Sequence, residues 1–190
     1  MKSVILGGPS RAGKSILSRR LNDSLRLCPM PIDMTVVSLM AAFPELEINW
    51  ENDEASLARL APFLKVLICK MALRSGSAYV FEGNHLTPQL LVNLGSDYPI
   101  LEGCVPVFLG SICTDRQARL RSLRDYAQSN PCYTKSMSDT DVLTLIDNLT
   151  AESKRIQQRC QRLEFAYFDT ASDFDAGLEA ARRYVESRVY

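Results

Sequence analysis

Hydrophobic residues in this chain alternate between short continuous runs and longer segments with helical spacing. Four runs have the length and apolar character of buried β-strands: Lys2–Leu6, Ser77–Phe81, Cys104–Leu109 and Glu164–Phe168. A weaker fifth run, Pro29–Asp33, contains two prolines, which lack amide donors and therefore favour an edge strand. Strands that alternate with helices are typical of a parallel sheet covered by helices on both faces. We therefore predict an α/β fold with a five-stranded parallel sheet and right-handed crossovers.

The segments between these runs carry apolar residues three or four positions apart, which places them on one face of a helix. The first such stripe consists of Ile16, Leu17, Leu21, Leu25 and Cys28. The second spans Leu57–Met71 and contains Pro62, which predicts a break or kink at that point. A third helix is predicted to begin at Ser138, because Ser-Asp-Thr-Asp resembles a capping box, and to reach Cys160. The last helix is predicted over Phe174–Val185.

The composition is that of an ordinary globular domain. In 190 residues, 22 Lys and Arg balance 22 Asp and Glu, and 46% of the residues are hydrophobic. A net charge of zero gives no broad positive surface, which argues against nonspecific binding to nucleic acid or membranes. No repeat, low-complexity tract or linker divides the sequence, so we predict one domain over residues 1–190.

Two further features concern the cellular compartment. The first apolar stretch, Val4–Leu6, is too short for a signal peptide or a membrane span, which predicts a cytoplasmic protein. The six cysteines are dispersed and lack the spacing of metal ligands. We expect them to be reduced thiols that mostly fill the core.

A phosphate-binding sequence lies between the first strand and the first helix. Gly8-Pro-Ser-Arg-Ala-Gly-Lys-Ser15 matches G-x-x-x-x-G-K-[ST], whose backbone amides cradle a polyphosphate at the start of a helix. Lys14 is predicted to reach the β- and γ-phosphates, and the Ser15 hydroxyl to hold Mg²⁺. The alternative is a glycine-rich turn that only caps the helix. The predicted nucleotide-binding residues are Gly8, Pro9, Ser10, Arg11, Ala12, Gly13, Lys14, Ser15 and Ile16.

Other strings narrow the class of protein. The D-x-x-G and N-K-x-D strings of GTPases and the LSGGQ string of transporters are absent, and the chain is short for a ring-forming ATPase. The chain resembles the small-molecule P-loop kinases, a group that includes shikimate and gluconate kinases, nucleoside monophosphate kinases, chloramphenicol phosphotransferase, zeta toxins and 2-phosphoglycerate kinase. The resemblance covers nearly the whole length. It implies a three-layer P-loop NTPase fold with a small lid, ATP and Mg²⁺ as cofactors, a small-molecule acceptor, and a monomer or homodimer.

The sequence E-G-x-H-L-x-P over Glu82–Pro88 looks closest to 2-phosphoglycerate kinase and its relatives. The resemblance implies that Glu82 lies on the Mg²⁺ or acceptor side of the phosphate-binding loop, with Gly83 and His85 beside the acceptor. The alternatives are a strand-end carboxylate that bonds nearby amides and a structural histidine.

Asp33 closes the weak second strand. In the kinases that this chain resembles, a carboxylate at this place accepts or orients the proton of the acceptor hydroxyl, so Asp33 is the predicted general base. The alternative is an ordinary turn aspartate. The strings that mark adenylate, shikimate and thymidylate kinases are absent, which argues against those acceptors.

Four arginines follow the fourth strand, where the resemblance implies a lid over residues 114–138: Arg116, Arg119, Arg121 and Arg124. Arginine suits phosphate oxygens because its fork binds two of them together. Arg119 and Arg124 are predicted to neutralise charge during transfer, and Arg116 to bind the nucleotide. A solvated helix face is the alternative. Residues 128–136 are polar and broken by proline, which predicts a mobile loop.

Residues 34–76 are predicted to bind the acceptor. Four apolar residues there alternate with acids: Phe43, Leu46, Ile48 and Trp50 lie among Glu45, Glu47, Glu51, Asp53 and Glu54. Such an acidic rim favours a neutral or cationic, partly apolar hydroxyl compound.

Three functions remain open from the sequence. The leading one is an ATP-dependent kinase that transfers the γ-phosphoryl group to a hydroxyl or phosphate of a small molecule, with Lys14, Asp33, Arg119 and Arg124 as catalytic residues. The second is an ATP-binding regulatory or toxin-like P-loop protein that acts through a protein partner. The third is a degenerate domain that binds no nucleotide, against which the intact Lys14 and Ser15 argue.

Overall fold

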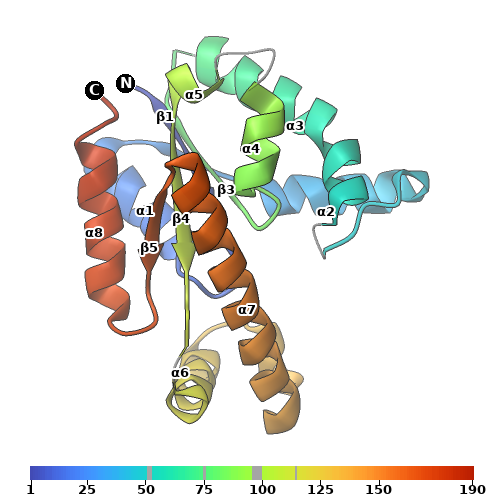
Figure 1. Cartoon of the computed structure of the whole chain (residues 1–190), viewed down its shortest axis with the longest axis vertical. Helices are drawn as coiled ribbons and strands as arrows, with labels where there is room; N and C mark the ends of the chain where they lie inside the picture. The colour runs from blue at the N-terminus through green and yellow to red at the C-terminus, as the bar shows by residue number, and fades with distance from the viewer. Residues whose placement is uncertain (51–52, 75, 96–99, 114) are drawn as a thin grey trace.

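A five-stranded parallel sheet lies at the centre of the computed structural model, which describes residues 1–50, 53–74, 76–95, 100–113 and 115–190 (Figure 1). The strands are β1 (Ser3–Gly7), β2 (Cys28–Pro31), β3 (Tyr79–Gly83), β4 (Cys104–Gly110) and β5 (Ala166–Asp169). Their order in the sheet is β2-β3-β1-β4-β5. The strand order confirms the predicted parallel sheet, and it places β2 at an edge as its prolines indicate. Glu51 of the predicted acidic rim and residue 114 at the start of the predicted lid lie outside the described residues.

Helices cover both faces of this sheet, so the fold has three layers. The helices are α1 (Lys14–Leu25), α2 (Ile32–Ala42), α3 (Glu54–Arg74), α4 (Pro88–Gly95), α5 (Ile100–Gly103), α6 (Arg116–Ser129), α7 (Asp139–Leu163) and α8 (Phe174–Glu186), with 3-10 turns η1 (Pro44–Leu46) and η2 (Tyr133–Ser136). In Figure 1, α1 and α8 lie on one side of the strands, and α3, α4 and α7 lie on the other.

Successive side chains of the central strand β1 point to opposite faces of the sheet, so this short strand contributes to two apolar cores. Val4 and Leu6 of β1 belong to the apolar core under α1 and α8, whereas Ile5 belongs to the core under α2, α3, α4 and α7. All three side chains are fully buried. A parallel strand that is buried on both faces reads as a continuous apolar run, which is why β1 stands out in the sequence.

One local prediction was wrong in part and another was wrong, and each has a physical reason. Helix α3 runs without a break through Pro62, so the predicted break is absent. Burial of Leu60 and Leu64 contributes roughly 1.5–3 kcal/mol each, comparable to the cost of about 3 kcal/mol for an internal proline. Cys28 is exposed in β2 and does not continue the buried stripe of α1, because the chain leaves that helix at Arg26 with φ 58°.

The remaining local features agree better with the sequence. Ser138 caps α7 as predicted: its Oγ accepts the amide of Asp141 at 3.1 Å. The six cysteines are free thiols, and Cys69, Cys104 and Cys160 are buried. None of the described helices combines the length and apolar character needed to cross a bilayer.

Candidate active site

The loop between β1 and α1 has the backbone shape of a phosphate cradle. Gly8 and Gly13 adopt φ values of 134° and 98°, and a Cβ on Gly8 would lie 2.1 Å from the Leu109 carbonyl oxygen. Only glycine fits at Gly8, because the neighbouring backbone cannot retreat. Helix α1 starts at Lys14 with no side-chain cap and no acidic residue in its first turn. Its amides and positive helix end therefore remain available to an anion.

The predicted nucleotide-binding residues divide into two groups. Six of them line a cavity of about 500 Å³: Ser10, Arg11, Gly13, Lys14, Ser15 and Ile16. The other three shape the loop from behind: Gly8, Pro9 and Ala12. The carbonyl of Ala12, for example, accepts a hydrogen bond from the Thr170 hydroxyl at 3.2 Å.

Lys14 is buried and points into this loop rather than into solvent. Its Nζ donates to three oxygens: the carbonyls of Gly8 (2.9 Å) and Pro9 (2.8 Å) and Oδ1 of Asn84 (2.7 Å). Burial lowers the pKa of its ammonium group. Three nearby carboxylates oppose that shift: Asp33, Glu82 and Glu152. Among the described residues, no carboxylate lies within hydrogen-bonding distance of the Lys14 ammonium. Phosphate oxygens would be suitable partners for it.

Ser15 and Glu82 meet beside Lys14 on the predicted Mg²⁺ side. The Ser15 hydroxyl donates to Glu82 Oε2 at 3.1 Å. Burial raises the pKa of the Glu82 carboxyl, and the bond from Ser15 and the charge of Lys14 oppose the shift. A hydroxyl and a carboxylate are hard oxygen ligands that suit Mg²⁺, which takes its remaining ligands from water and phosphate. Among the described residues there is no group of three or more His, Cys, Asp or Glu side chains that could hold a metal ion.

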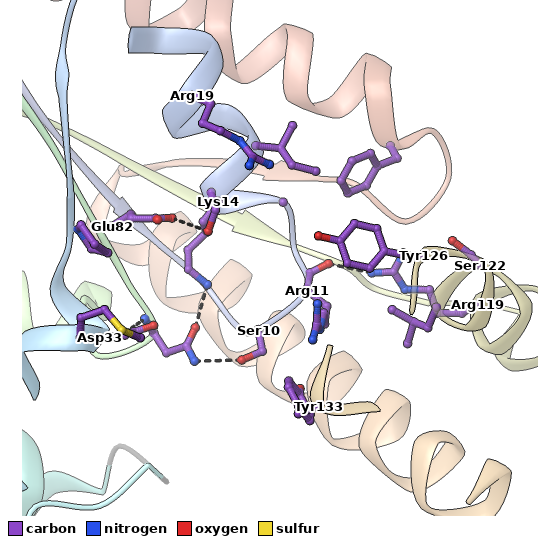
Figure 2. Close-up of a pocket in the computed structure, with 18 residues that line it drawn as sticks. Ser10, Arg11, Lys14, Arg19, Asp33, Glu82, Arg119, Ser122, Tyr126 and Tyr133 are labelled. Atoms are coloured by element: carbon purple, nitrogen blue, oxygen red, sulfur yellow. Dashed lines mark hydrogen bonds between the residues drawn. The ribbon is translucent and has the colours of Figure 1, made fainter. Parts of the chain in front are cut away.

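The cavity has two chemically different ends, which Figure 2 shows on either side of Lys14. Asp33 and Met34, from the start of α2, line one end. The other end is lined by Arg119 and Tyr126 of α6, together with Phe174 at the start of α8. One end is thus a carboxylate beside an apolar side chain, and the other is aromatic and cationic.

Asp33 is the second residue of α2 and does not end the strand as predicted, because the chain turns into a helix directly after Pro31. Its Oδ1 accepts the amide of Asn84 at 2.9 Å and lies 3.3 Å from His85 Nδ1. Gly83 packs against the same atom, since a Cβ there would lie 2.7 Å from Oδ1. The side chain is 23% exposed and lines the cavity.

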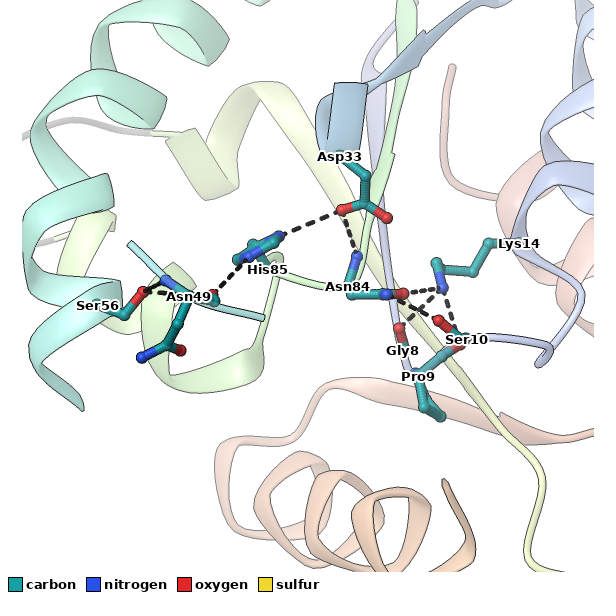
Figure 3. A network of polar contacts seen from close by, with 9 residues as sticks. All are labelled: Gly8, Pro9, Ser10, Lys14, Asp33, Asn49, Ser56, Asn84 and His85. Atoms are coloured by element: carbon teal, nitrogen blue, oxygen red, sulfur yellow. Dashed lines mark hydrogen bonds and ion pairs between the residues drawn. The ribbon is translucent and has the colours of Figure 1, made fainter. Parts of the chain in front are cut away.

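His85, which is predicted to lie beside the acceptor, is not among the described residues that line the cavity. Its side chain is fully buried, and its ring nitrogens face Asp33 and the carbonyl oxygen of Asn49 (Figure 3). In this structure the ring contacts Asp33 rather than the cavity. Its neighbour Asn84, which the sequence did not single out, lines the cavity and joins Asp33 to Lys14.

The three predicted lid arginines have different surroundings. Arg119 lines the cavity and donates from Nη2 to the carbonyl of Arg11 at 2.7 Å. Arg124 instead turns toward the η2 segment, where Nη1 donates to the Thr134 carbonyl at 2.6 Å and Nη2 to Asp139 at 2.7 Å. Arg116 forms an exposed ion pair with Asp147 at 2.7 Å. Neither Arg116 nor Arg124 is among the described residues that line the cavity.

Arg11 makes contacts that its place in the motif did not predict. Its guanidinium lies 4.7 Å from the ring centre of Tyr133 and 5.8 Å from that of Tyr126, and it donates to Cys132 Sγ at 2.8 Å. Attraction between a cation and aromatic faces holds the phosphate-binding loop to the segment from α6 to η2. The predicted mobile loop is thus docked on the site in this conformation.

No protein-family model and no curated protein matches this chain. Solved structures do match over its whole length. A sugar kinase from Janibacter sp. HTCC2649 has a TM-score of 0.59 at 13% identity, covering 100% of this chain and 96% of that chain. The chain has the fold of the P-loop kinases.

Two other solved structures agree. Shikimate kinase from Bacteroides thetaiotaomicron has a TM-score of 0.53 at 14% identity, covering 98% of this chain and 97% of that chain. A gluconokinase from Sinorhizobium meliloti 1021 has a TM-score of 0.50 at 13% identity, covering 100% and 98%. These matches confirm the predicted fold, and the chemistry follows from the site itself.

Proposed function

We propose that this protein is an ATP- and Mg²⁺-dependent kinase that transfers the γ-phosphoryl group to a small molecule. One observation carries the proposal: the phosphate-binding loop and the partly buried carboxylate of Asp33 border one cavity, with Lys14 between them. Transfer needs an anion cradle and a group that orients the acceptor oxygen, and little covalent chemistry from the protein. The proposal includes a single cytoplasmic domain, monomeric or homodimeric, that does not act on nucleic acid or membranes.

Each half of the cavity has its own task in this proposal. The loop amides and Lys14 hold the β- and γ-phosphates, and Ser15 and Glu82 hold Mg²⁺. Bound Mg-ATP supplies the transferable phosphoryl group. The aromatic end beside Tyr126 and Phe174 suits the flat base of the nucleotide.

The chemical step is assigned to Asp33. Its carboxylate accepts the proton of the acceptor hydroxyl while that oxygen bonds to the γ-phosphorus and the bond to the β-phosphate oxygen breaks, releasing ADP. Arg119 neutralises charge on the phosphates from the lid side. Arg124 acts indirectly, because its contacts fix the η2 segment against α6.

The acceptor proposed here is a hydroxyl compound without strong negative charge. Asp33 and Glu82 are the two carboxylates among the described lining residues, and both lie on the same side of Lys14 (Figure 2). The acidic rim contributes less than its sequence suggests: Glu47 pairs with Arg59 at 2.9 Å, and Asp53 accepts the amide of Ser56 at the start of α3. The preference for a neutral or cationic acceptor therefore rests on Asp33 and Glu82.

The test is ADP release from Mg-ATP across a panel of nucleosides, sugars, sugar acids, phosphoglycerates and amino alcohols. We expect one class to stimulate release, and Lys14→Ala to abolish the stimulation while the far-ultraviolet circular dichroism stays unchanged. Arg20→Ala is a matched control, because it removes an exposed cation from the same helix that does not line the cavity. Stimulated release that persists in Lys14→Ala would contradict the proposal.

A second candidate is a regulatory or toxin-like protein that binds ATP and acts through a protein partner. It is favoured by an exposed apolar group of residues around α2 and η1: Met34, Val37, Phe43, Leu46 and Trp50. Apolar surface of this kind often marks a protein interface. This candidate predicts Mg-ATP binding with no acceptor-stimulated ADP release, which the same panel measures.

A further inference from the structure

The one histidine of the chain is fully buried, and both of its ring nitrogens face oxygen atoms. His85 Nδ1 lies 3.3 Å from Asp33 Oδ1, and Nε2 lies 3.2 Å from the carbonyl oxygen of Asn49. Figure 3 shows the ring between these two partners, on the side of Asp33 away from Lys14.

These contacts suit a ring that carries a proton on each nitrogen. A carbonyl oxygen only accepts, so Nε2 must donate to Asn49. Asp33 Oδ1 already accepts the amide of Asn84 at 2.9 Å, which suits an ionised carboxylate. The contact with Nδ1 then needs a second proton on the ring. The geometry is that of an imidazolium beside a carboxylate.

The charges around the ring favour the same state. Asp33 faces it from α2, and Glu152 of α7 interacts with both His85 and Lys14. With Glu82 included, three carboxylates interact with Lys14, while Arg155 interacts with Glu152 and Arg19 with Glu82. The ring of Trp50 lies 5.0 Å from the imidazole centre and offers a further face for a cation.

We propose that His85, as an imidazolium, is a positioning residue that holds Asp33 Oδ1 inside the protein and leaves Oδ2 for the acceptor hydroxyl. Among the described residues, Oδ2 has no hydrogen bond, and the Asp33 side chain lines the cavity. The assignment of the acceptor hydroxyl rests on the proposed function. The imidazolium itself does not.

The network also connects the base to the predicted acceptor region. The amide of Asn49 donates to Ser56 Oγ at 3.0 Å, and Ser56 is fully buried at the start of α3. The Asn49 carbonyl that faces His85 Nε2 therefore belongs to a residue that Ser56 of α3 holds in place.

The first experiment is nitrogen NMR of the full chain labelled with ¹⁵N-histidine, with any histidine tag removed. Because the chain has one histidine, the imidazole signals come from His85 alone. At neutral pH we expect both ring nitrogens to be protonated in the wild type, and Asp33→Asn to convert the ring to a neutral form with one bare nitrogen. A neutral ring in the wild type, or an imidazolium that survives Asp33→Asn, would overturn the proposal.

The second experiment uses two conservative variants with the acceptor found by the panel. In His85→Asn the amide nitrogen takes the place of Nδ1 and keeps the contact with Asp33, whereas His85→Gln imitates Nε2 and keeps only the contact with Asn49. We expect kcat to fall roughly tenfold to a hundredfold in His85→Gln and less in His85→Asn, with KM for ATP within about twofold of wild type. In an Asp33→Asn background, His85→Gln should cause no further loss.

The outcomes separate the two proposals. A positioning role would be contradicted if His85→Gln lowers kcat as much in the Asp33→Asn background as in the wild type. It would also be contradicted if His85→Gln raises KM for ATP and leaves kcat normal. If no acceptor stimulates ADP release, the proposed function fails, while the NMR result still decides the state of His85. If a His85 variant does not fold, the wild-type and Asp33→Asn spectra still decide whether the His85 ring is an imidazolium.

Discussion

Replacing Gly83 by alanine tests whether the place of Asp33 matters, without changing any polar group. A Cβ at this position would lie 2.7 Å from Asp33 Oδ1 and 3.2 Å from Ile32 Cβ. Ordinary contact begins at 3.4 Å, so the carboxylate has to move by about 0.7 Å. It cannot do so freely, because Asn84 and His85 hold the same oxygen.

Two magnitudes follow from that displacement. Overpacking in a well-filled region costs about 1–3 kcal/mol, so the free energy of unfolding should fall by that amount. Misplacement of a reacting group by about 1 Å costs about a hundredfold in rate, so kcat should fall between tenfold and a hundredfold. The phosphate-binding loop is not contacted by the new methyl group, and the Kd for Mg-ATP should stay within about twofold.

The assays are urea unfolding, calorimetry with Mg-ATP, and acceptor-stimulated ADP release. Gly76→Ala is the matched control: Gly76 has φ 69°, and no described heavy atom lies within 4 Å of its Cβ position. That change should cost about 1 kcal/mol through backbone strain and leave kcat unchanged. A wild-type kcat in Gly83→Ala would refute the reasoning that turnover depends on the position of the Asp33 carboxylate.

Two further predictions address the metal and the lid. Glu82→Gln should raise the Mg²⁺ concentration needed for half-maximal ADP release by about tenfold, because the amide is a weaker Mg²⁺ ligand than the carboxylate. A Mg²⁺ titration at fixed ATP measures this concentration. An unchanged value would show that Glu82 does not hold the metal. Arg124→Met should lower Tm by roughly 5 °C, since its guanidinium bonds to Thr134, Met137 and Asp139 are worth about 1.5–3 kcal/mol. Arg119→Met should instead raise KM for ATP with little change in Tm. Thermal unfolding and ATP titration of both variants distinguish a binding role from a structural one. A raised KM in Arg124→Met together with a lowered Tm in Arg119→Met would contradict these assignments.

The features that the sequence predicted correctly are those set by residues adjacent in the chain. The strand β1, the phosphate-binding loop and the start of α1 are continuous in the chain, so Gly8, Gly13 and Lys14 could be recognised together. The edge position of β2 followed from its prolines in the same way. Each of these features has a backbone requirement that only particular residue types meet.

Features that depend on distant contacts were missed or misjudged. The burial of His85 follows from packing beneath Asn49 and Trp50, far away in the sequence. Arg124 was indistinguishable from Arg119 by residue type, and only the fold of η2 turns it away from the cavity. A long polar side chain takes its role from what surrounds it, and a single sequence does not display those surroundings.

The proposed site is divided in a way that bears on the comparisons, which show the fold alone. The nucleotide half is concentrated in residues 8–16, whose geometry any P-loop kinase must reproduce. The acceptor half is assembled from the start of α2, the segment before α3 and the turn after β3, and it meets the loop through Asn84. Asp33 itself is held by the amide of Asn84 and the side chain of His85, both in the turn after β3. Matches at 13–14% identity show the fold and do not identify the acceptor, because one fold serves many substrates; the acceptor has to be found by experiments on Asp33 and its neighbours.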